Sequence, residues 1–258
     1  ASFRRATVTG IDFEKKQVIV SRGQPIGYDK LIVSPGVGAN FFGIPGAEEY
    51  TRRIYTRRQA LEVRDIIFSG LELMAAERNP DKRFCAIVVG GGPTGVETAG
   101  ALAEMKTQGL PVLYPEIGVD NFHVVLVEMT DRLLGPFDRR LQRYTKRALA
   151  RLGVDVRLNT AVKEVFPDHV DFADGSQLAC DIVIWASGVG AHSVVKDWGL
   201  PQGRGGRILV EPDQQVVGFE DVYAAGDACL CESEPRPQLA QPAIQQGKLV
   251  AQNILAAQ

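Results

Sequence analysis

Three glycines at the spacing of a phosphate-binding turn follow a short apolar run near position 90. Gly90, Gly92 and Gly95 fit the pattern G-x-G-x-x-G. The turn comprises Gly90, Gly91, Gly92, Pro93, Thr94 and Gly95. In such a turn the first glycine permits a tight bend, the second lets a pyrophosphate approach the backbone, and the third lets the next helix pack closely. Because free N–H groups at a helix N-terminus attract phosphate, the spacing predicts a dinucleotide site here.

A carboxylate ends the next apolar run. Glu128 follows residues 124–127, which we expect to form the second parallel strand. An acid at this place accepts a hydrogen bond from the adenosine ribose 2′-hydroxyl of NAD. The gap from the glycines exceeds the usual ~20 residues because an irregular stretch, 107–121, precedes the strand. A solvated strand-end glutamate is the alternative, but a carboxylate there would repel a 2′-phosphate, so we favour NAD over NADP.

The elements that must position these groups alternate between strands and helices, which predicts an α/β fold. The expected buried parallel strands are residues 84–89, 124–127, 154–158 and 181–186. The expected helices are residues 56–78, 94–105, 138–152 and 241–257. The expected remaining strands are 6–11, 17–20, 28–33, 162–166 and 170–172, with an antiparallel pair of 208–210 and 214–217. The Asp174-Gly175 turn should close the hairpin of 162–166 and 170–172.

Composition excludes several classes of function. The chain has 258 residues and a formal net charge of −2, which gives no reason to expect nucleic-acid binding. No apolar run approaches the roughly 18 residues of a membrane span. The four cysteines form no C-x-x-C pair, and the three histidines are scattered, so no metal site is expected.

Two further motifs, together with the glycine turn, resemble those of two-dinucleotide flavoproteins. Residues 28–36 (YDKLIVSPG) are similar to the strand and turn that close their first flavin segment. Residues 223–228 (YAAGDA) resemble the second flavin signature, whose aspartate holds the FAD ribityl chain. The resemblance therefore implies FAD contacts at Gly36, Gly226 and Asp227, and NAD(H) at the inserted glycine turn.

Within that superfamily the chain most resembles type II NADH dehydrogenases, which are single-subunit NADH:quinone oxidoreductases. The similar segments are residues 41–46, 114–117, 127–134, 184–189 and 239–247. The resemblance implies hydride transfer from NADH to FAD, followed by electron transfer to a quinone. It also implies a cytoplasmic location, or for the full-length protein a peripheral place on the cytoplasmic face of the inner membrane, and it leaves a homodimer open.

The resemblance assigns roles to further residues. Glu97 matches the family's glutamate near the nicotinamide, although a glutamate in the first turn of a helix is also stabilised by the helix dipole alone. Gly188 is expected to clear space for the cofactor. Gln241, Gln245 and Gln246 are the quinone candidates, with a glutamine-rich surface helix as the alternative.

The domain organisation follows from the motif order. Residues 1–83 are expected to form part of an FAD domain, 84–200 a three-layer Rossmann-like NAD domain, and 201–258 a second FAD segment. Because the family's first flavin glycine motif is not among these residues, the chain is expected to be an internal segment that binds NAD better than FAD. The alternatives are a disulfide reductase, a sulfide:quinone or ferredoxin reductase, or a non-catalytic NAD(H)-binding module.

Overall fold

The computed structural model describes residues 2–77, 79, 81–192 and 194–256. It divides into two compact units. Unit 1 consists of Ala1–Gly38 and Val189–Gln258, and unit 2 of Ala39–Gly188. The predicted domain boundaries differ, because residues 39–83 pack within unit 2 and residues 189–200 within unit 1. Which unit holds which cofactor stays a prediction.

Unit 2 is built on a five-stranded sheet in which neighbouring strands all run parallel. Its strands, in spatial order, are β6 (Thr51–Arg52), β13 (Ile182–Trp185), β7 (Phe84–Val89), β8 (Phe122–Val127) and β9 (Val154–Arg157). The connections from β7 to β8 and from β8 to β9 contain α3 (Pro93–Glu104) and α5 (Arg139–Arg151). The predicted βαβ unit is therefore confirmed.

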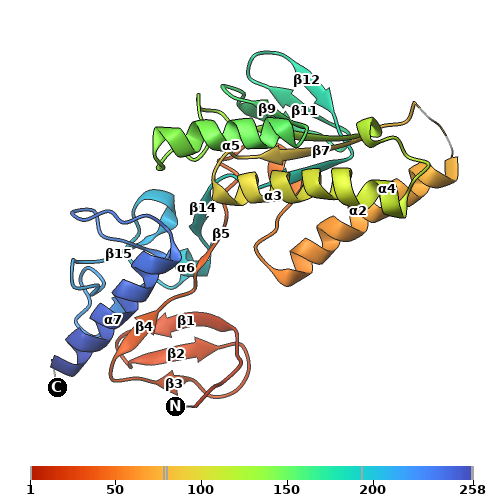
Figure 1. The fold of residues 1–258 in the computed structure, drawn as a ribbon. Helices are drawn as coiled ribbons and strands as arrows, with labels where there is room; N and C mark the ends of the chain where they lie inside the picture. Colours follow the sequence, from red (N-terminus) through yellow and green to blue (C-terminus); the bar gives the residue numbers. More distant parts are fainter. Residues whose placement is uncertain (1, 78, 80, 193, 257–258) are drawn as a thin grey trace. The chain divides into compact units, whose positions relative to one another are not determined.

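Alternating side chains of the sheet belong to two separate cores. Ala86 and Val88 face helices α2 (Arg57–Glu77), α3 and α5, which cover one side of the sheet (Figure 1). Ile87 and Val89 face a second, antiparallel sheet on the other side. Because β7 is buried on both faces, its sequence is almost continuously apolar. The result is the predicted three-layer α/β arrangement.

The antiparallel layer is a three-stranded meander. Its strands are β10 (Val162–Val165), β11 (His169–Phe172) and β12 (Gln177–Ala179). The prediction that Asp174-Gly175 closes the first hairpin is wrong, because this turn joins β11 to β12. Gly175 has φ +87°, and Asp174 Oδ1 accepts from Ser176 N at 2.9 Å, so these residues do form a turn, as predicted. The strand that follows the turn, β12, was not predicted.

The stretch 107–121 is more ordered than predicted. It contains the π-helix η1 (Met105–Gly109), α4 (Leu110–Leu113) and the 3-10 helix η2 (Val119–Asn121). Leu110 and Ile117 are buried in the core under α2 and α3. These helical turns lengthen the crossover between α3 and β8, and they account for the long gap between the glycine turn and Glu128. The short helix α1 (Ala47–Tyr50) completes unit 2.

Among the described residues, unit 1 contains one three-stranded sheet and three two-stranded ones. The antiparallel strands β1 (Val8–Asp12), β2 (Gln17–Val20) and β3 (Ile26–Gly27) form the first. Parallel pairs join β4 (Leu31–Val33) to β16 (Val222–Ala224), and β15 (Ile208–Leu209) to β17 (Cys229–Leu230). Remaining elements are β5 (Val37–Ala39), which pairs with β14 (Val189–Ala191), α6 (Val194–Asp197) and the 3-10 helix η3 (Arg204–Gly206).

Two strand predictions in unit 1 need correction. The predicted strand 28–33 begins only at Leu31, because Ile26–Gly27 pairs with β2 as a separate strand. The predicted antiparallel pair of 208–210 and 214–217 is reduced to the bridge Val210↔Val216, while Ile208 and Leu209 pair in parallel with β17. The second error arises because β17, the partner of β15, lies about 20 residues further along the chain.

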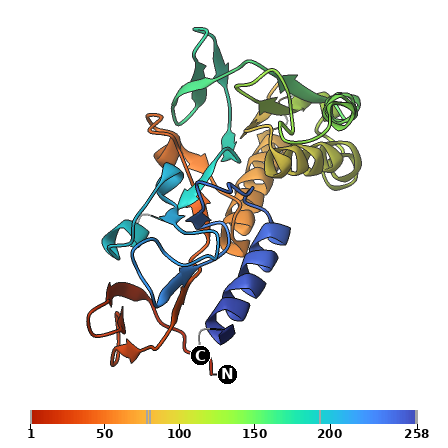
Figure 2. The same ribbon diagram turned by 90° about the vertical axis from the view of Figure 1, so that its left-hand side faces the viewer.

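Helix α7 (Ala240–Ala256) is the last element of unit 1, drawn in dark blue in Figure 2. It packs through Val250 on Tyr223 and Ala225. The predicted ends of α2 at Arg78 and of α7 at Ala257 lie outside the described residues. In the part of the chain that the structure describes, no helix combines the length and apolarity needed to cross a bilayer.

An ion-pair cluster in unit 1 makes its stability depend on pH. Asp221, just before β16, contacts Lys16 Nζ and Lys30 Nζ, the second at 2.6 Å, and these hydrogen bonds hold its pKa below the ordinary 3.8. A depressed pKa contributes stability above the ordinary value, and that stability is lost as the pH falls through the folded-state pKa. We expect Asp221→Asn to lower the melting temperature at neutral pH, with the difference shrinking as the pH falls below 3.8 and vanishing once the pH is below the lowered pKa of Asp221. Melting both proteins across the acid range checks this, and a difference that persists at the lowest pH would contradict it.

Candidate functional site

The turn between β7 and α3 bends sharply at Gly90. Its φ is +113°, and its N–H donates to Val127 O at 2.9 Å. A Cβ at this position would lie 2.9 Å from the carbonyl carbon of Ala186 at the end of β13. Because both the backbone conformation and the contact exclude a side chain, only glycine fits here.

Gly95 brings α3 against this turn. A Cβ on Gly95 would lie 1.8 Å from Gly90 O, so the helix approaches closer than any other residue would allow. Gly95 is buried, in agreement with the packing role predicted for the third glycine.

Gly92 is different, because nothing in the protein requires it to be glycine. Its backbone is extended (φ −75°, ψ −178°), and a Cβ would meet nothing within 4 Å. It is the N-cap of α3 but makes no side-chain cap, and Pro93 follows as the first helical residue. The space beside Gly92 is therefore open, and among the described residues no side chain caps the first turn of α3, as a site for an anion requires.

The Glu128 carboxylate holds the glycine turn. Its Oε2 accepts from Gly91 N at 2.6 Å, and its Oε1 accepts from Thr130 N at 2.8 Å. A Cβ on Gly91 would lie 2.7 Å from Leu133 Cδ2 and 2.9 Å from Glu128 Cγ. A side chain at position 91 would therefore displace side chains of the loop that follows β8. The sequence pattern placed Glu128 beside the nucleotide but gave no sign of this backbone contact.

Glu97 lies just beyond the first turn of α3. It is the fifth residue of the helix, so it is not in the first turn, and its side chain is exposed. The dipole effect falls off within the first turn and does not explain this residue.

In unit 1, the predicted flavin residues lie at the ends of the parallel strands β4 and β16. Gly36 and Gly226 have φ of +71° and +84°, and Ser34 Oγ donates to Ala225 O at 2.7 Å. Asp227 is half-buried, and its carboxylate accepts no hydrogen bond from the described residues. The structure therefore brings the two motifs together and leaves the Asp227 carboxylate open to a hydroxyl donor.

The three glutamines of α7 do not share one environment. Gln246 is 8% exposed, and its Oε1 accepts from Gly226 N at 2.9 Å. Gln241 and Gln245 are exposed. Gln246 thus fixes the turn before Asp227, a contact that periodicity could not reveal because it joins residues 20 apart.

Gly188 lies beside an aromatic ring. It has φ +69°, and a Cβ would lie 2.2 Å from Phe42 Cζ. Phe42 is 62% exposed, so the space beside Gly188 is filled by a surface ring. Trp185 is a core residue: it is 1% exposed and donates from Nε1 to Asn40 O at 2.9 Å.

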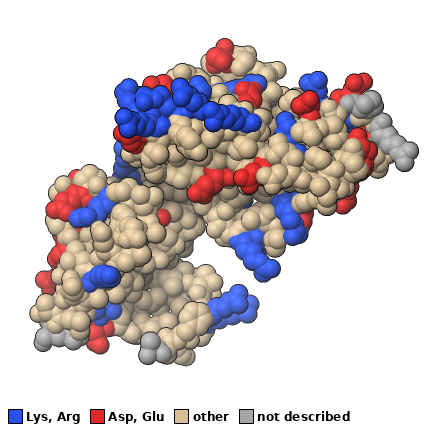
Figure 3. Space-filling view, in the orientation of Figure 1, with Lys and Arg blue, Asp and Glu red and all other residues tan. Residues whose placement is uncertain are grey.

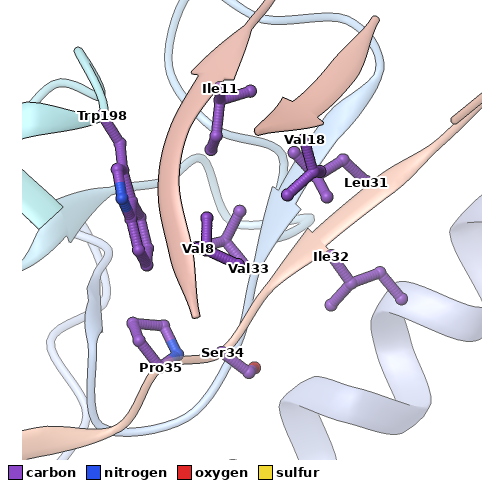
Figure 4. A pocket seen from close by; sticks show the side chains of 9 residues that line it. All are labelled: Val8, Ile11, Val18, Leu31, Ile32, Val33, Ser34, Pro35 and Trp198. Carbon is purple, nitrogen blue, oxygen red and sulfur yellow. The ribbon is translucent and has the colours of Figure 1, made fainter. Parts of the chain in front are cut away.

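A cavity of about 230 Å³ in unit 1 is almost wholly apolar (Figure 4). It is lined by β1, β2 and β4, with Trp198 on one side. The only hydroxyl in its lining, that of Ser34, already donates to Ala225 O. Trp198 Nε1, also in the lining, is buried and has no hydrogen-bond partner among the described residues. The lining therefore offers one free N–H but no charged side chain with which to orient a charged ligand.

The cysteines are poorly placed for nucleophilic chemistry. All four are free thiols. Burial is the main cause that raises the pKa of Cys85 and Cys229 to about 11, and that of Cys180 to about 12. Thiols with such pKa values are almost wholly protonated at neutral pH. Within residues 2–77, 79, 81–192 and 194–256, no three His, Cys, Asp or Glu side chains form a metal-binding group.

Comparison with known proteins agrees with this arrangement. A family profile described as pyridine nucleotide-disulphide oxidoreductase matches residues 2–247. A probable NADH dehydrogenase of Dictyostelium discoideum is 28% identical over 257 residues, which is 96% of this chain and 57% of that protein. The type II NADH:quinone oxidoreductase Ndh of Mycobacterium tuberculosis is 31% identical over 89% of this chain and 51% of its own length.

A similar fold is found in a solved structure, that of NDH2 from Plasmodium falciparum in complex with NADH. Its TM-score is 0.78 at 24% identity, over 87% of this chain and 49% of that one. The chain thus spans about half the length of the relatives it matches.

Proposed function

Since the chain belongs to the pyridine nucleotide-disulphide oxidoreductase family, we propose that it is the NADH-binding part, with a portion of the flavin site, of an NADH:quinone oxidoreductase. The observation that carries this proposal is the open N-terminus of α3 at Gly92, where a Cβ would meet no protein atom. The names of the relatives, NADH dehydrogenase and NADH:quinone oxidoreductase, support the choice of substrates.

The residues of the turn suit the NADH pyrophosphate. Gly90 and Gly95 keep the bend and the helix together, and Gly92 leaves room for the phosphates beside the helix amides. The positive end of the α3 dipole favours the negative charge. Glu128, held by two backbone amides, presents its remaining lone pairs to the adenosine ribose.

The flavin-side residues suit an FAD ribityl chain. The half-buried Asp227 carboxylate has acceptor capacity that no described residue uses, and Gln246 fixes the backbone next to it. When bound, FAD would supply the acceptor for the NADH hydride and pass the electrons on to a quinone. We propose Glu97 as the residue that binds or orients the nicotinamide amide, and the exposed Gln241 and Gln245 as quinone contacts. Gln246 and Gly188 contact Gly226 and Phe42 within the protein, and their contacts with quinone and NAD stay predictions.

Disulfide and persulfide chemistry needs a thiolate nucleophile, and burial raises the pKa of Cys85, Cys180 and Cys229 far above neutrality, so these three thiols do not supply one. The names of the relatives favour a quinone as the electron acceptor over the other oxidoreductase classes. A non-catalytic NAD(H)-binding module has no single observation in its favour.

Nucleotide binding tests the proposal and the role of Glu128 together. We expect the chain to bind NADH more tightly than NADPH, since the carboxylate repels a 2′-phosphate. Glu128→Gln removes this charge and places an amide NH₂ where one of two backbone N–H groups needs an acceptor. NADH affinity should therefore fall by roughly 10-fold. The ratio of NADH affinity to NADPH affinity should also fall, because the charge that repels the 2′-phosphate is gone.

Fluorescence titration with both nucleotides measures these effects, with the melting temperature of each variant as the control for folding. Failure of the unsubstituted chain to bind either nucleotide would refute the proposal itself. An unchanged NADH:NADPH ratio in Glu128→Gln would refute only the role given to Glu128.

A further inference from the structure

A cavity of about 550 Å³ lies in unit 2, at the amino ends of the parallel strands. The glycine turn follows the carboxyl end of β7, so this cavity is at the opposite end of the same sheet. Cys85 of β7 and His123 of β8 are paired in register and line it together. Leu178 and Ala179 of β12 line it from the side of the meander. Its volume is that of an ordinary small-molecule site.

The imidazole of His123, in the cavity wall, contains an unpartnered buried atom. Its Nε2 is shielded from solvent and makes no hydrogen bond with the described residues. Leaving a buried polar atom unpaired is unfavourable. The basic side chains of α5, which form the blue patch along the upper edge of Figure 3, differ because they are exposed and water solvates them. A ligand with a charge near the His123 ring would therefore meet a group that water does not already solvate.

Each carboxylate of the cavity wall already has a donor within the chain. The three pairs are Asp155 with Arg157 Nε at 2.8 Å, Asp181 with Cys85 N at 2.7 Å, and Asp168 with His169 Nδ1 at 2.7 Å. In the first of these pairs the two charges also neutralise each other. A cationic ligand would therefore have to compete with donors that the protein supplies.

The positive charge around His123, in contrast, is not neutralised. No ion pair among the described residues uses Arg83, which lines the cavity, or Lys106, which is 9% exposed. Burial is the main cause that lowers the pKa of His123, and the charges of Lys106 and Arg83 lower it further. Asp120 and Asp155 act in the opposite direction but do not prevail. Because the two cations repel a proton on the ring, they attract an anion placed beside it.

The rest of the wall is apolar or uncharged. Val125 and Leu178 line it, as do the thiols of Cys85 and Cys180, which burial keeps protonated at neutral pH. A hydrated inorganic anion would leave this surface without contacts, whereas an apolar group would bury it. The wall therefore suits a ligand that carries both a negative charge and an apolar part.

We propose that this cavity binds a small organic anion, with its acid group beside Arg83 and His123 and its apolar body against Val125 and Leu178. The inference goes beyond the proposed function and does not depend on it, because none of these residues belongs to the glycine turn or to the flavin motifs. The acid group accepts charge-assisted hydrogen bonds from the guanidinium, and the apolar body covers the wall that water would otherwise contact.

Titration with benzoate tests the proposal, with benzyl alcohol as a probe of similar size and no charge. The NMR signals of the His123 imidazole, assigned with the variant His123→Gln, report on the site. Benzoate should move these signals, and benzyl alcohol should bind on the order of 10-fold more weakly. Arg83→Gln should lower the benzoate affinity by on the order of 10-fold. Arg57→Gln is the matched control and should leave the affinity unchanged, because Arg57 is also exposed and without an ion pair among the described residues, but lies on α2.

Both arginine variants should melt at the temperature of the unsubstituted chain, because both side chains are exposed, so a loss of binding cannot be ascribed to unfolding. The proposal would be overturned if benzoate at millimolar concentration left the His123 signals unmoved. Benzyl alcohol binding as tightly as benzoate would also overturn it, as would equal losses of affinity in the two arginine variants. The NADH titration is independent of these outcomes, so a chain that binds only one of the two ligands separates this proposal from the proposed function.

Discussion

Replacing Gly92 by valine should abolish most NADH binding while leaving the fold intact. The backbone at Gly92 is extended and suits any residue, and a Cβ would meet nothing within 4 Å. The only cost to folding is a less favourable N-cap, about 1 kcal/mol. A branched side chain would nevertheless occupy the space that the pyrophosphate needs, so charge-assisted hydrogen bonds to the helix amides would be lost. We expect affinity to fall on the order of 100-fold.

Isothermal titration with NADH, with a melting curve for each protein, measures both effects. Gly27→Ala is the control, because Gly27 also has open space around it and lies in unit 1, in β3. An NADH affinity that survives in Gly92→Val would mean that the phosphates bind elsewhere.

Unlike Gly92→Val, which should leave the fold intact, Gly95→Ala should destabilise unit 2. The added Cβ would lie 1.8 Å from Gly90 O, and a backbone atom in a turn constrained on both sides cannot move away cheaply. We expect a loss of about 3 kcal/mol in the free energy of unfolding, together with loss of NADH binding.

Gly100→Ala in the same helix is the matched control. Its Cβ would meet only Leu149 Cδ2 at 4.0 Å, so the better helix propensity of alanine should stabilise α3 by up to about 1 kcal/mol. Urea denaturation distinguishes the two variants. Equal stability of Gly95→Ala and Gly100→Ala would show that the close approach of α3 to the turn is not needed.

The strand, glycine turn and helix around Gly90 were predictable because their signals are local. Residues 84–89 form β7 with the expected limits, and the glycines after it take the conformations that the motif requires. The resemblance to type II NADH dehydrogenases is likewise confirmed by the relatives that the chain matches. Short-range periodicity and the glycine spacing were enough to predict the turn, and the order of three separated motifs was enough to indicate the family.

What the sequence could not provide depends on contacts between distant residues. Thr51 and Arg52 join the parallel sheet beside β13, about 130 positions away, so residues 39–83 belong to unit 2 and not to the predicted first domain. Gln246 points into the core to hold Gly226, although its neighbours in the helix are exposed. The bond from Gly91 N to Glu128 spans 37 residues. No composition or period indicates such pairings.

The backbone amide signals of α3 test the central claim most directly. If the NADH pyrophosphate binds at the helix N-terminus, ¹⁵N-resolved NMR spectra recorded during NADH addition should show their largest shifts at the amides of Gly92, Thr94 and Gly95. Inorganic pyrophosphate should move the same signals at higher concentration. Shifts that leave these three amides unchanged and gather elsewhere in the chain would contradict the assignment of the glycine turn as the NADH site.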